Sequence, residues 1–161
     1  MRPLIYTLDN GIRIVHLPVN SMVAHCGLIT GAGSGNEESS EHGLAHFTEH
    51  MFFKGTARRK SYHILSRLED VGGELNAYTT KEETVVHASV LSEHYERALE
   101  LIHDIVFNST FPDHEIEKEK EVIIEEIKSY RDNPSELIFD DFEEIVFHNH
   151  PLGRNILGTP E

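Results

Sequence analysis

The five residues His46-Phe47-Thr48-Glu49-His50 constrain this chain more than any other stretch. The segment 43–53 around them is mostly apolar, and a helix that is apolar on nearly all sides is usually buried. Residues four apart lie on one face of a helix, so His46 and His50 present two imidazoles about 6 Å apart along its axis. Glu49 lies beside the same face. Buried ionisable groups need partners, and a metal ion would supply one.

The order His-x-x-Glu-His is the reverse of the His-Glu-x-x-His zinc motif. Two imidazoles one turn apart suit two ligands of a tetrahedral zinc ion, whose Zn–N bonds are about 2.0–2.1 Å long. The carboxylate of Glu49 would then stand next to a metal-bound water. The chain contains 12 His, and a shuffled sequence contains this pattern about 0.1 times. A surface helix with a chance histidine pair is therefore the alternative.

The formal net charge of −14 argues against binding to a nucleic-acid backbone, which needs clustered Lys and Arg. The acidity is compatible with attraction of basic peptides, and equally with an ordinary solvated helical surface. Cys26, the single cysteine, cannot form an internal disulfide, and its apolar surroundings predict a small core residue. There is no recognisable signal peptide, and no apolar run reaches the ~20 residues that span a bilayer. We therefore expect no membrane contact and a reducing, cytoplasmic compartment.

Periodicity and turn signals predict the order of the elements. Asn10-Gly11 indicates a hairpin, and the apolar residues of 12–17 predict a strand that is buried on much of both faces. The glycine-rich run 31–36 predicts a flexible loop, and Asn133-Pro134 predicts the start of a helix. The expected strands span 4–8, 12–19, 22–30, 74–79 and 84–91. The expected helices cover the histidine motif up to Gly55, and then 61–71, 92–108, 113–131 and 134–148.

Three strands, two helices, two strands and three helices make an α+β pattern. The fold class that we expect has two layers, with a mainly antiparallel sheet and helices packed on one of its faces. The length allows one domain or part of a larger one. No closing turn or capping element precedes the last residue, Glu161, so we expect the chain to be a fragment.

A catalytic zinc usually has three protein ligands, so two histidines need a third partner. The acidic helix expected at 113–131 is the best place to search. On its helical wheel, Glu119 and Glu126 fall inside the apolar arc. Glu125 points away, and Glu115 is a rival that lies one turn earlier. One buried carboxylate would bind zinc and the other would support a ligand. The alternative is a pair of edge salt bridges with Arg or Lys.

Several ordered motifs along nearly all of the chain resemble the pitrilysin, insulinase and mitochondrial processing peptidase family of zinc endopeptidases (peptidase family M16), most closely its processing-peptidase branch. The stretch 46–50 resembles the family's inverted zinc motif, and Glu126 stands at the position of its distal Glu ligand. Glu119 matches a further family glutamate seven residues earlier. Segment 72–79 resembles the family's substrate-binding edge strand, and 33–37 resembles the loop before the zinc helix.

The resemblance implies a zinc-dependent endopeptidase that hydrolyses peptide bonds with a metal-activated water. Its cofactor would be Zn²⁺, and the metal ligands would be His46, His50 and Glu126. The catalytic residues would be Glu49 and Glu119. Glu49 would take the water proton and pass it to the leaving amine, and Glu119 would steady the site from behind the ligands.

The substrate-binding residues that the resemblance implies are Asn76 and Ala77. They would hold the main chain of a peptide or an unfolded protein as an added β-strand. Family members consist of two homologous halves, so a homodimer or heterodimer with a second half is the expected partner. We expect 1–161 to be a partial N-terminal catalytic domain of a bacterial protein, which binds metal and has little peptidase activity by itself.

Two other functions fit parts of the pattern. The family includes non-catalytic scaffold subunits that kept the fold and lost the chemistry. These usually lack part of the ligand set, whereas this chain has all of it. The ribosyl-homocysteine lyase fold also has the order His-x-x-Glu-His, and it needs a catalytic cysteine beside the metal. Cys26 lies in an expected strand well before the motif, which disfavours that lyase.

Overall fold

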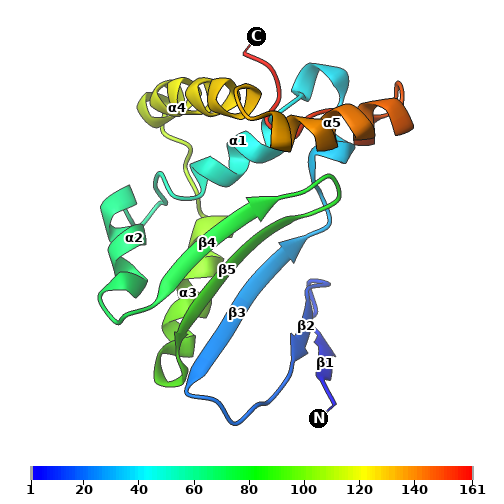
Figure 1. Ribbon diagram of the computed structural model, residues 1–161. Coiled ribbons are helices and arrows are strands. Elements are labelled where there is room, and N and C mark those ends of the chain that lie inside the picture. Colours follow the sequence, from blue (N-terminus) through cyan, green and yellow to red (C-terminus); the bar gives the residue numbers. More distant parts are fainter. Residues whose placement is uncertain (1, 161) are drawn as a thin grey trace.

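The computed structural model describes residues 2–160. Within them, a three-stranded antiparallel sheet has the order β3-β5-β4, and a two-stranded hairpin, β1-β2, forms a separate sheet (Figure 1). The strands are β1 (Leu4–Thr7), β2 (Arg13–His16), β3 (Val23–Thr30), β4 (Glu74–Thr79) and β5 (Thr84–Leu91). The helices are α1 (Leu44–Met51), α2 (Ser61–Glu69), α3 (Tyr95–Phe107), α4 (Asp113–Arg131) and α5 (Pro134–Val146). The α+β class expected from the sequence is confirmed.

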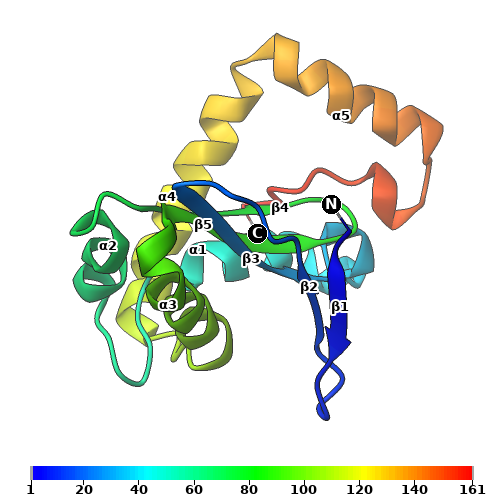
Figure 2. The same ribbon diagram turned by 90° about the horizontal axis from the view of Figure 1, so that it is seen from below.

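The core lies between one face of the sheet and helices α2 and α3. Alternate residues of β5 point into it, and Val86, Ala88 and Val90 are each at most 2% exposed. Leu101 and Ile105 from one stripe of α3 belong to the same cluster. Figure 2 shows α2 and α3 on the same side of the sheet. The sheet is therefore a packed platform, and it fixes its edge strand β4 beside α1.

Helix α4 packs against α1, and a turn at Asn133 leads into α5. The Asn133 side chain accepts a hydrogen bond from the Ser135 backbone N–H (3.3 Å), so Asn133 and Pro134 begin the helix as the sequence predicts. Figure 2 shows α5 on the opposite side of the sheet from α3. Among the described residues, no helix has both the length and the apolar character needed to cross a membrane.

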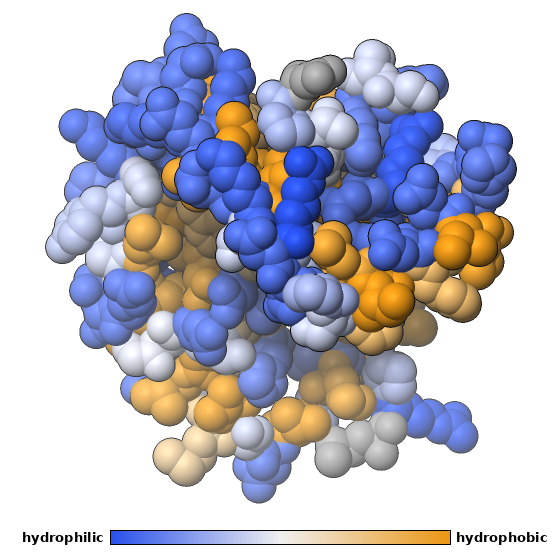
Figure 3. Space-filling view, turned by 45° about the horizontal axis from the view of Figure 1, so that its top comes forward, coloured by the Kyte–Doolittle hydropathy of each residue, from blue (hydrophilic) through white to orange (hydrophobic). Residues whose placement is uncertain are grey.

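Helix α5 turns its polar side toward the body of the molecule. Asp140 accepts a hydrogen bond from the Asn155 amide, and Glu143 pairs with Lys81 at 3.1 Å. The outward stripe is apolar, and its members are all more than half exposed: Ile138, Phe139, Phe142, Ile145 and Val146. Figure 3 shows apolar side chains gathered in patches at the surface. The usual orientation of an amphipathic helix is thus reversed here.

The hairpin contradicts one prediction from the sequence. We expected residues 12–17 to be buried on much of both faces, but Ile14, Val15 and Leu17 are 42%, 68% and 51% exposed. In the part of the chain that the structure describes, β1 and β2 pair only with each other. The apolar side chains of this hairpin are therefore largely open to solvent. An apolar run predicts burial only where a partner surface is present, and the local pattern does not encode that partner.

The glycine-rich run 31–36 follows β3 outside the sheet, as predicted, and its residues 33–35 are packed. Ser34 is fully buried, and its backbone N–H donates a 3.0 Å hydrogen bond to the Thr80 carbonyl. A Cβ atom on Gly33 would overlap the same carbonyl oxygen. Glycine at this position allows the backbone to approach the β4–β5 turn closely. The sequence pattern alone cannot distinguish a glycine that allows close approach from one that provides flexibility.

Truncation of a core leucine should show how much stability this packing supplies. Leu101→Ala removes a side chain that is 0% exposed, whereas Leu99→Ala on the same helix removes one that is 48% exposed. We expect Leu101→Ala to lower the free energy of unfolding by about 2–5 kcal/mol, because it leaves a cavity. The Leu99→Ala control should lose about 1 kcal/mol or less. Urea unfolding followed by circular dichroism measures both, and equal losses would contradict the assigned core.

Candidate metal centre

Helix α1 directs its two histidines at one point near α4. Their Nε2 atoms are 3.2 Å apart, and their ring centroids are 4.5 Å apart. His46 is 7% exposed, and the His50 side chain is 20% exposed. One helical turn separates the two residues, as the spacing in the sequence requires. Two imidazole nitrogens therefore face each other in a largely buried position.

Glu126 reaches the same point from α4. One of its carboxylate oxygens lies 3.7 Å from His46 Nε2, and the other lies 3.4 Å from His50 Nε2. Across residues 2–160, these three residues form the one group of three or more potential metal ligands whose ligand atoms all lie within 4.8 Å of one another. The Glu126 side chain is 42% exposed. Glu126 therefore lies at the edge of the apolar arc in which the helical wheel of 113–131 places it.

The separations between these atoms fit a tetrahedral metal site. Ligand atoms that bind one zinc ion at about 2.0–2.2 Å lie about 3.3–3.5 Å from one another. Here the two Nε2 atoms lie 3.2 Å apart, and those of His46 and His50 lie 3.7 and 3.4 Å from Glu126 Oε1 and Oε2, respectively. Two imidazole nitrogens and one carboxylate form a donor set typical of catalytic zinc, which keeps a fourth position for water. The donor set fits the metal that the sequence predicts.

A buried carboxylate orients the His50 ring. Glu119 Oε1 lies 2.8 Å from His50 Nδ1, Glu119 Oε2 lies 2.5 Å from Lys54 Nζ, and Glu119 is 4% exposed. An ionised carboxylate only accepts hydrogen bonds, so the Nδ1–H of His50 is the donor in this contact. Its Nε2 faces His46 and Glu126. Carboxylates in this position typically orient metal-binding histidines and raise their basicity.

Burial keeps the other imidazole neutral. Burial, with a smaller contribution from His50, lowers the pKa of His46 to about 4 from the ordinary 6.5. Metal binding requires the neutral ring, so His46 is ready to act as a ligand at neutral pH. Its Nδ1 atom is buried without a hydrogen-bond partner in the described residues. The polar contacts of this ring are therefore made at Nε2, which faces Glu126.

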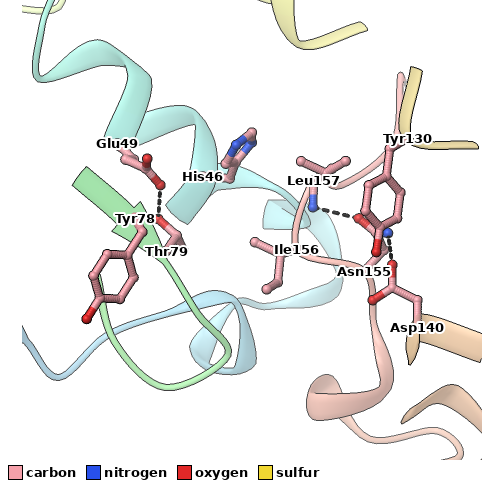
Figure 4. A pocket seen from close by; sticks show the side chains of 9 residues that line it. All are labelled: His46, Glu49, Tyr78, Thr79, Tyr130, Asp140, Asn155, Ile156 and Leu157. Atoms are coloured by element: carbon pink, nitrogen blue, oxygen red, sulfur yellow. Dashed lines mark hydrogen bonds between the residues drawn. The ribbon is translucent and has the colours of Figure 1, made fainter. Parts of the chain in front are cut away.

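Glu49 projects from the same helix into an adjoining pocket. The pocket has a volume of about 280 Å³, and His46, Glu49 and Thr79 all line it (Figure 4). The Thr79 hydroxyl donates a 2.6 Å hydrogen bond to Glu49 Oε2. Burial raises the pKa of the Glu49 carboxyl, and the Thr79 hydrogen bond and His50 act against this rise. A carboxyl group with a raised pKa is suited to take up a proton and return it.

The cluster has an excess of negative charge. With Glu49, Glu119 and Glu126 ionised and Lys54 as the cation in contact with Glu119, the formal charge of these four side chains is −2. The two imidazoles are left out of this count. Carboxylates that are partly or fully buried need compensating charge. A divalent cation between His46, His50 and Glu126 would supply it.

The far wall of the pocket comes from residues that the sequence did not identify. Tyr130, Asp140 and Asn155 lie there, on α4, α5 and the segment after α5 (Figure 4). Burial, and then the Asp140 carboxylate, raises the pKa of Tyr130 to about 12. The Tyr130 hydroxyl therefore stays protonated, and it donates a 3.3 Å hydrogen bond to the Glu136 backbone carbonyl. No local motif marks these residues, because only the turn between α4 and α5 brings them opposite α1.

Asn76 and Ala77 lie on β4 but outside this pocket. Asn76 donates a side-chain hydrogen bond to Glu74 (2.7 Å), and Ala77 packs against the core. The next two residues of the strand, Tyr78 and Thr79, line the pocket instead. In the described part of the chain, β4 pairs only with β5. What β4 offers beside the site is therefore the main chain of its free edge.

Known proteins resemble this chain along almost its full length. The family described as Insulinase (Peptidase family M16) matches residues 15–160. The uncharacterized zinc protease YmxG of Bacillus subtilis is 44% identical over 158 residues, which are 97% of this chain and 38% of that protein. The beta subunit of the mitochondrial-processing peptidase of Rattus norvegicus is 41% identical over 156 residues, 96% of this chain and 32% of that subunit. The chain thus spans about a third of the length of these relatives.

A solved structure agrees with the fold. It is a peptidase M16 inactive domain from Pseudomonas fluorescens, and the TM-score is 0.86 over 98% of this chain and 39% of that one. The sequence identity is 21%, so this likeness concerns the fold alone. The family match and the two relatives above 40% identity show, in addition to the fold, the family to which the chain belongs. On these grounds the chain belongs to the insulinase family, peptidase family M16.

Proposed function

We propose that this chain is the catalytic part of a zinc-dependent endopeptidase, which hydrolyses peptide bonds with an activated water. The observation that carries the proposal is the convergence of His46, His50 and Glu126 on one point, with Glu49 in the adjoining pocket. The family supports it, because relatives more than 40% identical are named zinc protease and processing peptidase.

Each residue of the cluster has a distinct role in this proposal. His46, His50 and Glu126 hold Zn²⁺, and Glu119 keeps the His50 ring at the required angle. When bound, zinc supplies a Lewis acid that lowers the pKa of water toward ~7. Glu49 takes the proton of the attacking water and delivers it to the amine of the leaving group.

The substrate class that we propose is a peptide or an unfolded protein. The free edge of β4 offers main-chain donors and acceptors to an extended chain, which Asn76 and Ala77 would hold as an added strand. The net charge of −14 favours basic substrates. Because its relatives are about three times as long, we propose that 1–161 forms part of an N-terminal catalytic domain. A second homologous half, in a homodimer or heterodimer, would complete the enzyme, and the piece alone should cleave peptides poorly.

Removal of single ligands tests the metal centre directly. We expect Glu126→Gln and His50→Ala to weaken zinc affinity by more than about 100-fold, because the loss of a supporting group alone costs 10–100-fold. Glu125→Gln is the matched control, since Glu125 is the neighbouring residue of α4 and its side chain is 73% exposed. Competition with a chromophoric chelator gives the affinity, and elemental analysis gives the zinc content. Unchanged zinc content in both ligand variants would defeat the assignment.

A separate comparison tests the support of His50. Glu119→Gln keeps the shape of the side chain and removes the charge that faces His50 and Lys54. We expect zinc affinity to fall by about 10–100-fold. Glu117→Gln should behave like the unmodified protein, because Glu117 lies on the exposed side of the same helix, where its side chain is 72% exposed. Equal affinities of the two variants in the same chelator competition would remove Glu119 from the site.

A variant of the proposed base distinguishes an enzyme from a non-catalytic subunit of the same fold. Such a subunit is the alternative function that the sequence leaves open. Glu49→Gln should keep zinc and slow peptide hydrolysis by about 10²–10⁴-fold, the usual contribution of a general base. The comparison requires the longest form of the protein that cleaves a quenched fluorescent peptide. If that form cleaves no peptide, or if the variant cleaves at the unmodified rate, the proposed chemistry is wrong.

A further inference from the structure

Helix α1 begins without a capping side chain of its own. Its N-cap residue is Gly43, which has a φ of 95° and makes no side-chain cap hydrogen bond. The first backbone N–H groups of a helix have no partner inside the helix. Since α1 has eight residues and starts at Leu44, His46 belongs to its first turn. A group that satisfies these N–H donors would also anchor the turn that carries His46.

The carboxylate of Glu37 performs this task from six residues upstream. Its Oε2 accepts a 2.9 Å hydrogen bond from the Gly43 N–H, and its Oε1 accepts a 2.7 Å hydrogen bond from the Ala45 N–H. Glu37 is 8% exposed, so water competes little for these donors. A negative charge at a helix N-terminus is also favoured by the helix dipole. Both oxygens of one side chain thus hold the entrance of α1, and Ala45 directly precedes His46.

The metal centre depends on the orientation of this short helix. Both imidazoles come from α1, whereas Glu126 comes from α4. A metal site tolerates deviations of only about 0.2 Å in its ligand distances. The C-terminal turn of α1 is held by the contact between His50 and Glu119. Without Glu37, the N-terminal turn would be free to fray, and His46 would lose its fixed distance from Glu126.

The segment after α5 holds Glu37 in place. Arg154 donates hydrogen bonds to the Glu37 backbone carbonyl (2.9 Å) and to the Ser39 hydroxyl (3.1 Å). Arg154 is itself held, because Lys81 donates to its backbone carbonyl. Four residues later, a Cβ atom on Gly158 would come within 2.7 Å of the backbone that leads into α1. The chain beyond α5 therefore presses against the loop that carries Glu37.

We propose that Glu37 is a positioning residue, which anchors the N-terminal turn of α1 and so sets where His46 meets His50 and Glu126, and that Arg154 keeps Glu37 in this position. The inference rests on the proposed function, because it concerns the geometry of the proposed zinc site. It differs from a general role in stability. A residue that only stabilises the fold would leave the coordination geometry of the folded protein unchanged.

The test compares three variants of the chain with bound Zn²⁺ or Co²⁺. Glu37→Gln keeps the size of the side chain but offers one acceptor oxygen instead of two. Arg154→Met removes the donor groups and keeps an apolar stem. Glu38→Gln is the matched control, because Glu38 is the exposed neighbour in the same loop. Chelator competition measures zinc affinity, and the visible absorption bands of Co²⁺ report the coordination geometry. Thermal unfolding of the metal-free forms measures stability separately.

We expect Glu37→Gln to bind zinc about 10-fold more weakly and to shift the Co²⁺ bands. Arg154→Met should change the zinc affinity and the Co²⁺ bands in the same direction but to a smaller extent. Glu38→Gln should match the unmodified chain in both measurements. Suppose that both variants unfold at a lower temperature but, while still folded, keep the Co²⁺ bands and the zinc affinity of the unmodified chain. That result would overturn the proposal. If Glu37→Gln does not fold, Arg154→Met decides by the same criterion. An unmodified chain that binds neither metal would refute the proposed function itself, and this role with it.

Discussion

The contact of the buried Glu119 carboxylate with His50 and Lys54 is the interaction on which the candidate site depends. A carboxylate that is 4% exposed is costly to bury without partners, and here an imidazole N–H and an ammonium group provide them. The contact joins α1 to α4 and selects the proton position of the His50 ring. Glu126 lies seven residues further along α4, which is two helical turns, so it faces the same helix. One buried ion pair thus aligns two elements and brings the third proposed ligand to the histidines.

Much of the fold was predictable because it follows from local rules. Asn10-Gly11, Asn133-Pro134 and the strand signal of 84–91 mark their elements within a few residues of the observed ends. What the sequence could not supply was the surface opposite each apolar face. The hairpin strand 12–17 has the pattern of a buried strand and stays exposed, and the stripe on α5 faces outward. Periodicity identifies the side of an element that can be buried, but the covering partner lies elsewhere in the chain or outside it.

The candidate site likewise has one part that local sequence rules predict and another that depends on how distant segments pack. The helical spacing of His46 and His50, and the wheel position of Glu126, indicated three residues whose ligand atoms the structure brings within 4.8 Å of one another. The contacts of Thr79 with Glu49 and of Lys54 with Glu119 had no signal in the sequence. Each of them joins elements whose approach is decided by the packing of the whole domain. Charged and hydroxyl residues are common on any surface, so their type alone does not mark them.

The partial exposure of Glu126 has a consequence for how an ion would be kept here. Structural zinc sites are sealed by four protein ligands, and they release the metal only when the fold opens. At this centre, one proposed ligand stands at the rim, with 42% of its side chain in contact with solvent. A small chelator can approach from that side while the core between the sheet and α3 stays closed. Occupancy would then follow the free zinc concentration of the surroundings, and the same folded chain would exist in a loaded and an empty form.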